Sequence, residues 1–342
     1  MIDRGIVEVL ARYPRRSRPL DEPEPLGAAG GLSGARFWRF RSAQGLLVLR
    51  AWPPHGPDRG HLEQVHRWLA QAGDLGFIPV PVADLAGATL QEFQGQLWEL
   101  APWMPGASES ARPPAIGRVR SAFAAMGALH QRLAAQRREG VSPGLAHRLA
   151  EVTSLAHGGL DGLERAIRRA PGTSSDPTRM NAARWLTLAR AVAPRLSEPL
   201  REAASRVVPL QPCLRDARPG HFLFERDRVT GLVDFGAMGV DCVAGDLARL
   251  AGEWLDEAAD PSARGEAMTA YERVRPLAAG EAALIDAFAA STALLIGERW
   301  LRWEFVEGRR FDDPRAASDG LARGLAALER LAIASAPRLV GW

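Results

Sequence analysis

Two aspartates that flank a short predicted β-hairpin constrain this chain more than any other feature. Phe222–Phe224 and Val229–Val233 are apolar runs, and a charged turn at residues 225–228 separates them, a pattern typical of a hairpin. Asp216 precedes the first strand, and Asp234 follows the second. Because a hairpin brings its ends together, we expect the two carboxylates to lie close in space. Neighbouring carboxylates repel each other unless a cation or a shared proton separates them, so this unit is a candidate metal-assisted site.

The size and composition of the chain favour an ordinary globular protein. Of its 342 residues, 46% are hydrophobic and 24% are charged, enough to bury one large core or two smaller ones. No signal-peptide core is visible, and no apolar run approaches the roughly 20 residues that span a bilayer. Cys213 and Cys242 lack metal-ligand spacing and are expected to be reduced thiols. A cytoplasmic protein without membrane contact is the expectation.

The chain contains no lysine, so all 43 residues in its Lys and Arg total are arginines. This excludes a P-loop lysine and a Schiff-base lysine. A fold that normally uses a lysine on phosphate must use arginine here, whose planar guanidinium also pairs with phosphate. The net charge is only +3, and the arginines are spread along the chain. A nucleic-acid partner is therefore not expected.

A glycine-rich segment at residues 26–34 precedes two predicted strands, at residues 36–40 and 46–50. Glycines allow backbone N–H groups to approach an anion such as phosphate closely. A plain glycine-rich hairpin loop is the alternative. Two further strands are predicted at residues 88–93 and 96–101.

Arg50 ends the predicted strand at residues 46–50, which is otherwise apolar. A lone arginine there usually faces solvent, but beside a phosphate-binding loop it could pair with phosphate or with an acid. The predicted helix at residues 61–72 carries Glu63 close to its apolar face. Glu63 is therefore a candidate partner for Arg50, with a solvated glutamate as the alternative.

The Pro/Gly-rich segment at residues 102–106 predicts a domain boundary. The part before it is predicted to be a small β-rich lobe with one helix, and the part after it is mainly helical. Helices are expected at residues 119–134, 180–193, 196–207, 243–255, 263–274, 279–306 and 314–334, with a weaker pattern between residues 139 and 180.

The order of these features resembles the aminoglycoside phosphotransferase and choline kinase-like family of protein-kinase-like phosphotransferases. The family pattern runs close to H-G-D-x-x-x-x-N, a hairpin, I-D-F/W and then D-L-A. Here it reads LRDARPGH at residues 214–221, VDF at 233–235 and DLA at 246–248. The run RPGHFLF at residues 218–224 has the shape of the family's H-P-G-N-v-L-F. In element order the resemblance covers nearly the whole chain.

The resemblance implies an α+β, protein-kinase-like bilobal fold. Residues 1–102 would form a small antiparallel β lobe with one helix that binds nucleotide. Residues 103–342 would form a larger, mainly helical lobe that carries the catalytic hairpin and binds the acceptor.

The resemblance also implies a role for each matched position. Asp216 would orient the acceptor hydroxyl and take its proton, and Asp234 would hold Mg²⁺ between the nucleotide phosphates. Arg50 falls at the phosphate-pairing lysine of the family, and Glu63 falls at the helix partner of that lysine. Asp246 would brace the catalytic loop. The loop over the phosphates and the hinge that meets the purine would be formed by Gly30, Gly31, Ser33, Gly34, Leu100 and Ala101.

Two positions depart from the family pattern. Leu214 replaces the histidine before the catalytic aspartate, a residue that mainly supports the loop. His221 replaces the asparagine that ligates the second metal. Histidine can ligate a divalent cation, but Mg²⁺ prefers oxygen. Mg²⁺ and Mn²⁺ are therefore both candidate metals, with Asp234 and His221 as their ligands.

The predicted activity is transfer of the γ-phosphate of ATP or GTP to a hydroxyl group of a small molecule, by a monomer or a homodimer. One alternative is a degenerate relative that binds nucleotide or ligand without efficient transfer. Another is a hairpin whose acids merely cap turns. A cationic acceptor would need acids and aromatics in the helical part, where surface charge and core packing are the alternative explanation. The candidates there are Glu298, Trp300, Trp303, Glu304, Glu307, Asp312 and Asp313.

Overall fold

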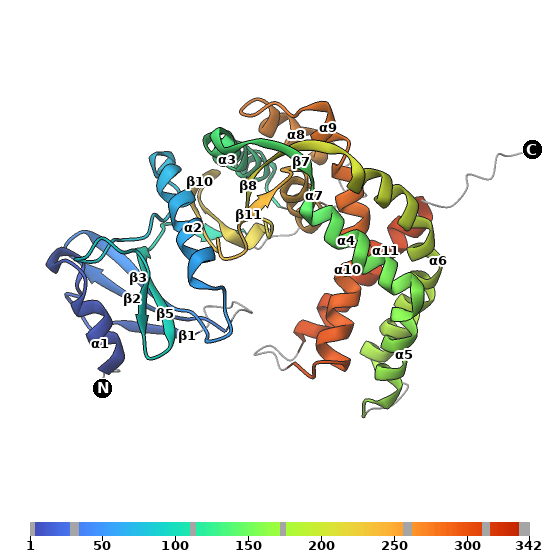
Figure 1. The fold of residues 1–342 in the computed structure, drawn as a ribbon, viewed down its shortest axis with the longest axis horizontal. Coiled ribbons are helices and arrows are strands. Elements are labelled where there is room, and N and C mark those ends of the chain that lie inside the picture. The colour runs from blue at the N-terminus through green and yellow to red at the C-terminus, as the bar shows by residue number, and fades with distance from the viewer. Residues whose placement is uncertain are drawn as a thin grey trace, which may run out of the picture. The chain divides into compact units, whose positions relative to one another are not determined.

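The chain forms two compact units, each built from several separate stretches of sequence. A computed structural model describes residues 4–27, 34–109, 114–171, 176–255, 262–309 and 315–334. Unit 1 comprises residues 1–137, 211–239 and 250–276, and unit 2 comprises residues 138–210, 240–249 and 277–342. Figure 1 shows the elements of both units along the chain.

Unit 1 begins with a five-stranded antiparallel sheet in the order β1-β2-β3-β5-β4 (Figure 1). The strands are β1 (Glu24–Gly27), β2 (Arg36–Ser42), β3 (Gly45–Ala51), β4 (Gln91–Phe93) and β5 (Gln96–Pro102). The helices are α1 (Arg4–Ala11) and α2 (Arg59–Gln71), and the side chain of Asp58 caps α2 by accepting the N–H of His61. One face of the sheet buries Trp38 and Leu49 in a core that includes residues of α1. The strands and helix predicted for this part are confirmed.

The rest of unit 1 surrounds the predicted hairpin. Its β-hairpin is confirmed: β9 (Phe222–Glu225) pairs antiparallel with β10 (Arg228–Leu232), and β6 (Ala107–Ser108) extends the sheet in the order β10-β9-β6. The helices here are α3 (Ile116–Leu133) and α8 (Ala263–Glu272), which pack against each other. Short 3₁₀ turns occur at Arg15–Ser17, Gly73–Leu75, Ala134–Gln136 and Pro219–His221.

Unit 2 is a bundle of long helices with a small sheet. Its helices are α4 (Pro143–Ser154), α5 (Leu160–Arg169), α6 (Pro177–Ser205), α9 (Ala279–Ala282), α10 (Ile285–Phe305) and α11 (Ala316–Ala334), with a π turn at Leu155–Gly159. The sheet has the order β11-β8-β7 and consists of β7 (Arg138–Val141), β8 (Val207–Cys213) and β11 (Gly239–Asp241), and α7 (Ala244–Trp254) follows it. The fully buried Trp185 lies against Gly297, so α6 and α10 approach closely at a position without a side chain.

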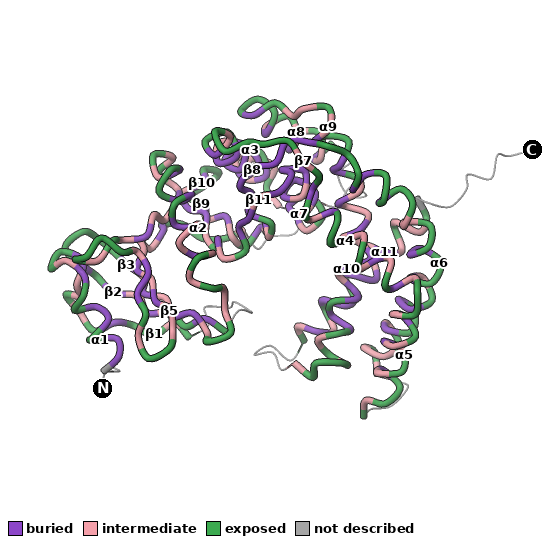
Figure 2. Tube along the Cα trace, viewed as in Figure 1, coloured by how far each residue is buried: buried purple, intermediate pink, exposed green. Residues whose placement is uncertain are grey.

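Three features of this part differ from the predictions. The weak pattern between residues 139 and 180 contains β7, α4 and α5. The helices predicted at residues 180–193 and 196–207 are one helix, α6, which continues through Pro194 and Pro199. Its predicted end at residue 207 is instead the start of β8, a strand buried from Val208 to Cys213 (Figure 2). Two prolines inside that strand hide it, because proline cannot donate to a sheet ladder.

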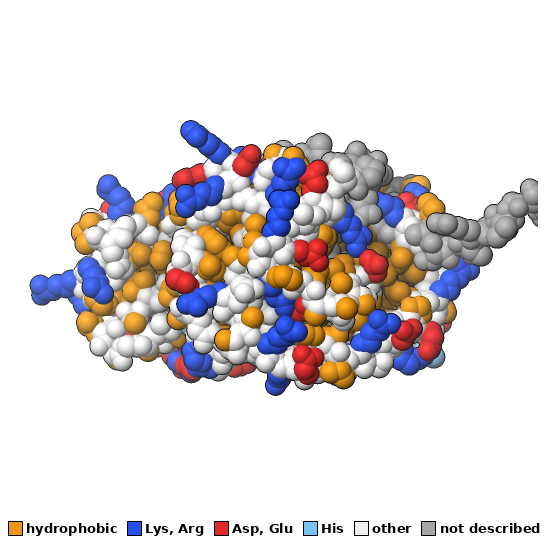
Figure 3. Space-filling view, turned by 90° about the horizontal axis from the view of Figure 1, so that it is seen from above, with side chains coloured by type: hydrophobic (Ala, Val, Ile, Leu, Met, Phe, Trp, Pro, Cys, Tyr) orange, Lys and Arg blue, Asp and Glu red, His pale blue; other side chains and the backbone are white. Residues whose placement is uncertain are grey.

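The stretch Ala279–Phe305, which covers α9 and α10, is long and apolar enough to cross a membrane by length and composition. Its helix α10 packs against α4, α6 and α11 of the same unit. A core helix passes the same test of length and composition, and this packing explains the apolar character of α10. On the face drawn in Figure 3, charged side chains of both signs are interspersed, and no large single-sign patch is visible among the described residues.

Candidate active site

The two aspartates that flank the β9–β10 hairpin lie at or beside residues with a left-handed backbone. Asp216 lies in the loop after β8, directly behind Arg215, whose φ is 63°. Asp234 follows β10 and has a φ of 64°. A left-handed backbone is uncommon outside glycine, although Asp and Asn tolerate it better than most residues. Leu214, at the family's histidine position, is buried and supports this loop by packing. Such strained positions cluster at functional sites.

The Asp234 carboxylate faces a different basic group on each oxygen. Its Oδ1 lies 3.5 Å from Nη2 of Arg50, and its Oδ2 lies 3.6 Å from Nε2 of His221. The Asp234 side chain is still 47% exposed. The structure therefore brings three of the predicted site residues together.

Asp216 joins this group through its charge. Burial lowers the pKa of His221, while the charges of Asp234 and Asp216 act to raise it, and burial prevails. For Arg218, burial acts to lower the pKa, but Glu253, Asp216 and Asp234 outweigh it and raise the pKa. The charges of both aspartates therefore act on the same histidine and the same arginine. With its lowered pKa, His221 is a neutral imidazole at pH 7, the form that can bind a metal.

Arg50 is held between two aromatic rings and an acid. Its guanidinium carbon lies 3.4 Å from the ring centroid of Trp52 and 5.1 Å from that of Phe37. Its Nη1 lies 3.6 Å from Oε1 of Glu99, the residue opposite Arg50 in the β3–β5 pair. Only 12% of the Arg50 side chain is exposed. Stacking on an aromatic face suits the planar guanidinium and would not suit an ammonium group equally.

A histidine of α2 holds Glu99 in turn. Nε2 of His66 lies 2.8 Å from Oε2 of Glu99, and Nδ1 of His66 lies 2.8 Å from the hydroxyl of Thr89. Burial acts to raise the pKa of Glu99, but the hydrogen bond with His66 and the charges of Arg50 and His66 outweigh it, and the pKa is lowered. We name this chain of contacts, His66–Glu99–Arg50, the arginine clasp.

The arginine clasp corrects the predicted pairing of Arg50 with Glu63. Glu63 instead forms an i,i+4 ion pair with Arg59 at 3.4 Å, on the exposed side of α2. The buried face of α2 carries Leu62, Val65 and His66, so the residue that reaches inward is His66. Its helical spacing from Leu62 was the signal in the sequence that could have identified it.

The predicted nucleotide loop and hinge are described only in part. Gly30, Gly31 and Ser33 lie outside the described residues. Gly34 has a φ of 74°, a conformation that favours glycine. The carbonyl of Leu100 already accepts the N–H of Val82 at 2.7 Å, and its side chain is fully buried. The hinge role of Leu100, which would use its backbone groups, stays a prediction. The roles of Gly34 and of Ala101, which lies opposite Val48 in the sheet, remain predictions.

The segment after Asp234 is fixed against the sheet lobe of unit 1. The carbonyl of Gly236 accepts a hydrogen bond from Nε2 of His61 at 2.9 Å. A Cβ at Gly236 would lie 2.7 Å from Trp52, so a larger residue would push this segment away from the ring that stacks on Arg50. Sequence reasoning did not identify Trp52, His61 or His66 as site residues.

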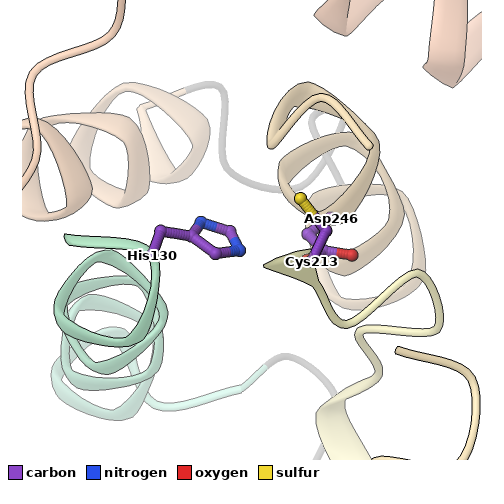
Figure 4. A group of neighbouring side chains, drawn as sticks. All are labelled: His130, Cys213 and Asp246. Carbon is purple, nitrogen blue, oxygen red and sulfur yellow. The ribbon is translucent and has the colours of Figure 1, made fainter. Parts of the chain in front are cut away.

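Two buried residues of unit 1 lie close to each other. His130 of α3 and Cys213 at the end of β8 place possible ligand atoms within 4.8 Å of each other (Figure 4). Nδ1 of His130 is 2.9 Å from the hydroxyl of Tyr271 in α8, and the His130 side chain is fully buried. Cys213 and Cys242, both described, form no disulfide.

Three of the seven residues considered for a cationic acceptor already make contacts within unit 2. Glu298 pairs with Arg302 at 2.7 Å. Trp300 is buried and packs edge-on against Trp303, over which Arg309 lies at 4.8 Å. Asp312 and Asp313 lie outside the described residues. The alternative of surface charge and core packing therefore accounts for Glu298, Trp300 and Trp303.

Comparison with known families agrees with this geometry. The sequence matches the phosphotransferase enzyme family over residues 26–284. The chain belongs to this family. No curated protein matches the chain. The family is one of small-molecule phosphotransferases, and the roles of the individual residues stay predictions.

Solved structures of small-molecule kinases share the fold of this chain. An amicoumacin kinase in complex with AMP-PNP, Ca²⁺ and its ligand is 15% identical, with a TM-score of 0.61 and coverage of 96% of this chain and 94% of that one. A microcompartment-associated aminopropanol kinase is 15% identical, with a TM-score of 0.62 and 96% coverage of both chains. An aminoglycoside phosphotransferase from Alicyclobacillus acidocaldarius is 15% identical, with a TM-score of 0.56 and coverage of 95% and 93%. These likenesses confirm the predicted α+β, protein-kinase-like fold.

Proposed function

We propose that this phosphotransferase moves the γ-phosphate of ATP or GTP to a hydroxyl group of a small molecule. The observation that carries the proposal is the cluster around Asp234: Arg50 and His221 face its two oxygens, and Asp216 acts on the same histidine. A base, a metal-binding acid and a phosphate-binding cation are the groups that phosphate transfer needs. The amicoumacin kinase structure, which contains AMP-PNP and Ca²⁺, supports a nucleotide and a divalent metal as its co-reactants.

The donor groups fit a divalent cation. Asp234 offers a half-exposed carboxylate, and His221 offers a neutral imidazole 3.6 Å from it. A carboxylate suits Mg²⁺ and Mn²⁺, whereas an imidazole suits Mn²⁺ better than Mg²⁺. When bound, the metal would neutralise charge on the nucleotide phosphates. Asp234 and His221 would hold it.

The chain's own side chains would carry out the remaining steps. Asp216 would accept a hydrogen bond from the acceptor hydroxyl and take its proton as the phosphate is transferred. Arg50 would pair with phosphate oxygens through its guanidinium, at a position fixed by Trp52 and the arginine clasp. These roles account for a burial pattern in which Arg50 is nearly enclosed and Asp234 remains open.

The decisive experiment is a transfer screen with ATP and GTP, each with Mg²⁺ and with Mn²⁺, against hydroxylated metabolites and antibiotics. Acceptor-dependent nucleotide consumption and a phosphorylated product are the expected result. Metal-dependent nucleotide binding without transfer to any acceptor would instead favour the degenerate relative. If calorimetry shows no nucleotide binding with either metal, the hairpin acids merely cap turns.

We expect His221→Asn to shift the metal preference toward Mg²⁺. The substitution restores an oxygen ligand, so the ratio of Mg²⁺-supported to Mn²⁺-supported transfer should rise about tenfold, the size of effect seen when ligand surroundings change. Wild-type activity should also fall below the His221 pKa, which lies under its usual value, because the protonated ring cannot bind metal. This acid limb should be absent in the variant. Transfer rates against metal concentration and pH test both expectations.

His147→Asn is the matched control, because His147 is an exposed histidine of unit 2 paired with Glu151. An unchanged metal preference in His221→Asn would show that His221 does not contact the metal.

Glu99→Gln tests the arginine clasp. The KM for nucleotide should rise about tenfold, and the free energy of unfolding at pH 7 should fall by about 1–3 kcal/mol, because Arg50 and His66 lose their shared acid. Because the folded-state pKa of Glu99 is lowered, its stabilising effect is present above its unfolded pKa. The effect is lost as pH falls through the folded value. The stability difference between wild type and variant should therefore disappear in acid. Urea unfolding at pH 7 and in acid measures it.

Glu92→Gln serves as the control in the same sheet. Glu92 is 62% exposed and pairs with Arg59 at 3.1 Å, so its loss should change stability by less than about 1 kcal/mol. Equal effects of the two substitutions would argue against a special role for Glu99.

A further inference from the structure

The two acidic neighbours of Arg50 do not fix its guanidinium by themselves. Its ion pairs with Glu99 and Asp234 span 3.6 Å and 3.5 Å, longer than the roughly 2.7–3.2 Å of a well-formed N–H···O hydrogen bond. Its Nε is buried and has no hydrogen-bond partner in the part of the chain that the structure describes. The orientation of this guanidinium therefore depends on what packs against it.

The indole ring of Trp52 provides that packing. Its centroid lies 3.4 Å from the guanidinium carbon of Arg50, so the ring covers one face of the group. Trp52 is only 3% exposed, and its backbone N–H donates to the carbonyl of Leu97 in β5 at 2.8 Å. The side chain packs in a small core with Leu62 of α2 and with Leu90. Strand β5 and helix α2 therefore hold the ring at a fixed place beside Arg50.

The same ring lies against the segment that follows Asp234. A Cβ at Gly236 would lie 2.7 Å and 3.3 Å from two carbons of the Trp52 ring, so the backbone of Gly236 packs directly on it. The carbonyl of Gly236 accepts a hydrogen bond from His61 at 2.9 Å. His61 lies in the first turn of α2, which Asp58 caps. The ring and the helix thus hold the chain two residues beyond the metal-binding acid.

We infer that Trp52 is a positioning residue, which sets the separation between Arg50 and the loop of Asp234 and makes position 50 specific for arginine. A planar guanidinium can lie flat on an indole face and still direct its N–H groups at phosphate, whereas an ammonium is a compact, strongly hydrated charge. The effect on nucleotide binding rests on the proposed function, and the coupling between ring and guanidinium does not. The alternative is a tryptophan that only fills the core.

A double-mutant cycle between Arg50→Lys and Trp52→Met tests the preference for arginine, because methionine fills a core without offering a ring face. In the wild type, Arg50→Lys should raise the nucleotide Kd about tenfold, the size of a desolvated cation–π contact. In the Trp52→Met background, the same change should cost at most about twofold. Calorimetric titrations with AMP-PNP and with GMP-PNP, each with Mn²⁺, measure these Kd values.

Two further backgrounds separate a positioning role from a structural one. Trp52→Phe restores an aromatic face, so Arg50→Lys should again cost about fivefold there. Trp98→Met removes an equally buried tryptophan of β5, which stacks on Trp38 with centroids 5.5 Å apart, and should leave the tenfold cost unchanged. If the cost of Arg50→Lys is the same in all these backgrounds, Trp52 only fills the core and the inference is wrong.

Thermal unfolding without nucleotide distinguishes this inference from the proposed function. Arg50→Lys should lower the melting temperature by about 2 °C in the wild type and should have no effect in the Trp52→Met background. If even the wild type binds no nucleotide, the proposed function fails, and this thermal coupling still decides whether Trp52 positions Arg50. Equal shifts in both backgrounds would rule the positioning role out.

Gly236→Ala tests the spacing of the Asp234 loop and does not depend on the folding of Trp52→Met. The backbone of Gly236 is not left-handed, so the contact of the new Cβ with the Trp52 ring is the main cost of alanine. The Mn²⁺ concentration for half-maximal nucleotide binding should rise about tenfold, as when the surroundings of a metal ligand are disturbed. The smaller ring of Trp52→Phe, added to the same chain, should bring this concentration back to within about threefold of the wild type.

Gly252→Ala on α7 is the matched control, because nothing lies within 4 Å of a Cβ at that position. Its metal dependence should equal that of the wild type. Wild-type metal dependence in Gly236→Ala, or a loss that Trp52→Phe does not relieve, would show that the ring does not set the position of the loop.

Discussion

Asp216→Asn should lower kcat for phosphate transfer by about 10²- to 10⁴-fold, the usual contribution of a positioned general base. The amide keeps the size of the carboxylate and can still contact the acceptor hydroxyl, but it cannot take the proton. Nucleotide affinity should stay within about twofold, because the metal-binding acid is Asp234. Rates with the best acceptor and nucleotide Kd from calorimetry provide the two measurements.

The control for this change lies in the turn of the same hairpin. Asp227 is 68% exposed and 3.8 Å from Arg118, so Asp227→Asn removes an acid from the hairpin without approaching the site. Transfer should be unchanged. If Asp216→Asn retains wild-type transfer, Asp216 is not the base.

Asp234→Asn should weaken nucleotide binding as well as turnover, unlike Asp216→Asn. Loss of the carboxylate removes the principal oxygen ligand for the metal, so metal-dependent nucleotide affinity should fall together with kcat. A contribution of several kcal/mol corresponds to about a 10³-fold loss of kcat/KM. The increase in nucleotide affinity that Mg²⁺ or Mn²⁺ produces in the wild type should disappear. Titrations of nucleotide with and without each metal measure this.

Asparagine is the appropriate substitution at this position for a backbone reason. Asp234 has a φ of 64°, which Asn tolerates better than most other residues. The variant therefore keeps the loop while removing the charge that faces Arg50 and His221. Retention of a metal-dependent gain in affinity would show that another group binds the metal.

The hairpin and its two aspartates could be predicted from the sequence because their geometry is local. Turn residues and alternating apolar runs determine a hairpin within a dozen residues, and the ends must then meet. The partner of Arg50 could not be predicted in this way. Glu99 faces Arg50 only because β5, and not the sequence neighbour β4, lies beside β3 in the sheet. Local spacing favoured Glu63, whose side chain points outward to Arg59.

In the helical part, too, local sequence patterns failed to predict two elements, β8 and the full length of α6. The prolines of β8 are signals against a strand, and the buried position of this strand between β7 and β11 overrides them. Likewise, α6 continues through two prolines whose usual effect is to break a helix. In both places tertiary packing determines the outcome, and no local pattern carries that information.

The division of the chain into two units has a consequence for how this protein can be dissected or recombined. The predicted functional boundary between residues 102 and 103 is a single cut, and it remains a prediction. The chain passes from one compact unit to the other five times, after residues 137, 210, 239, 249 and 276. β8 and α7 each contribute residues to both units. Each unit is compact in space but is not one continuous stretch of sequence. No single truncation therefore yields either unit whole. Replacing one half of the chain with the matching half of a relative would split the cores of both units.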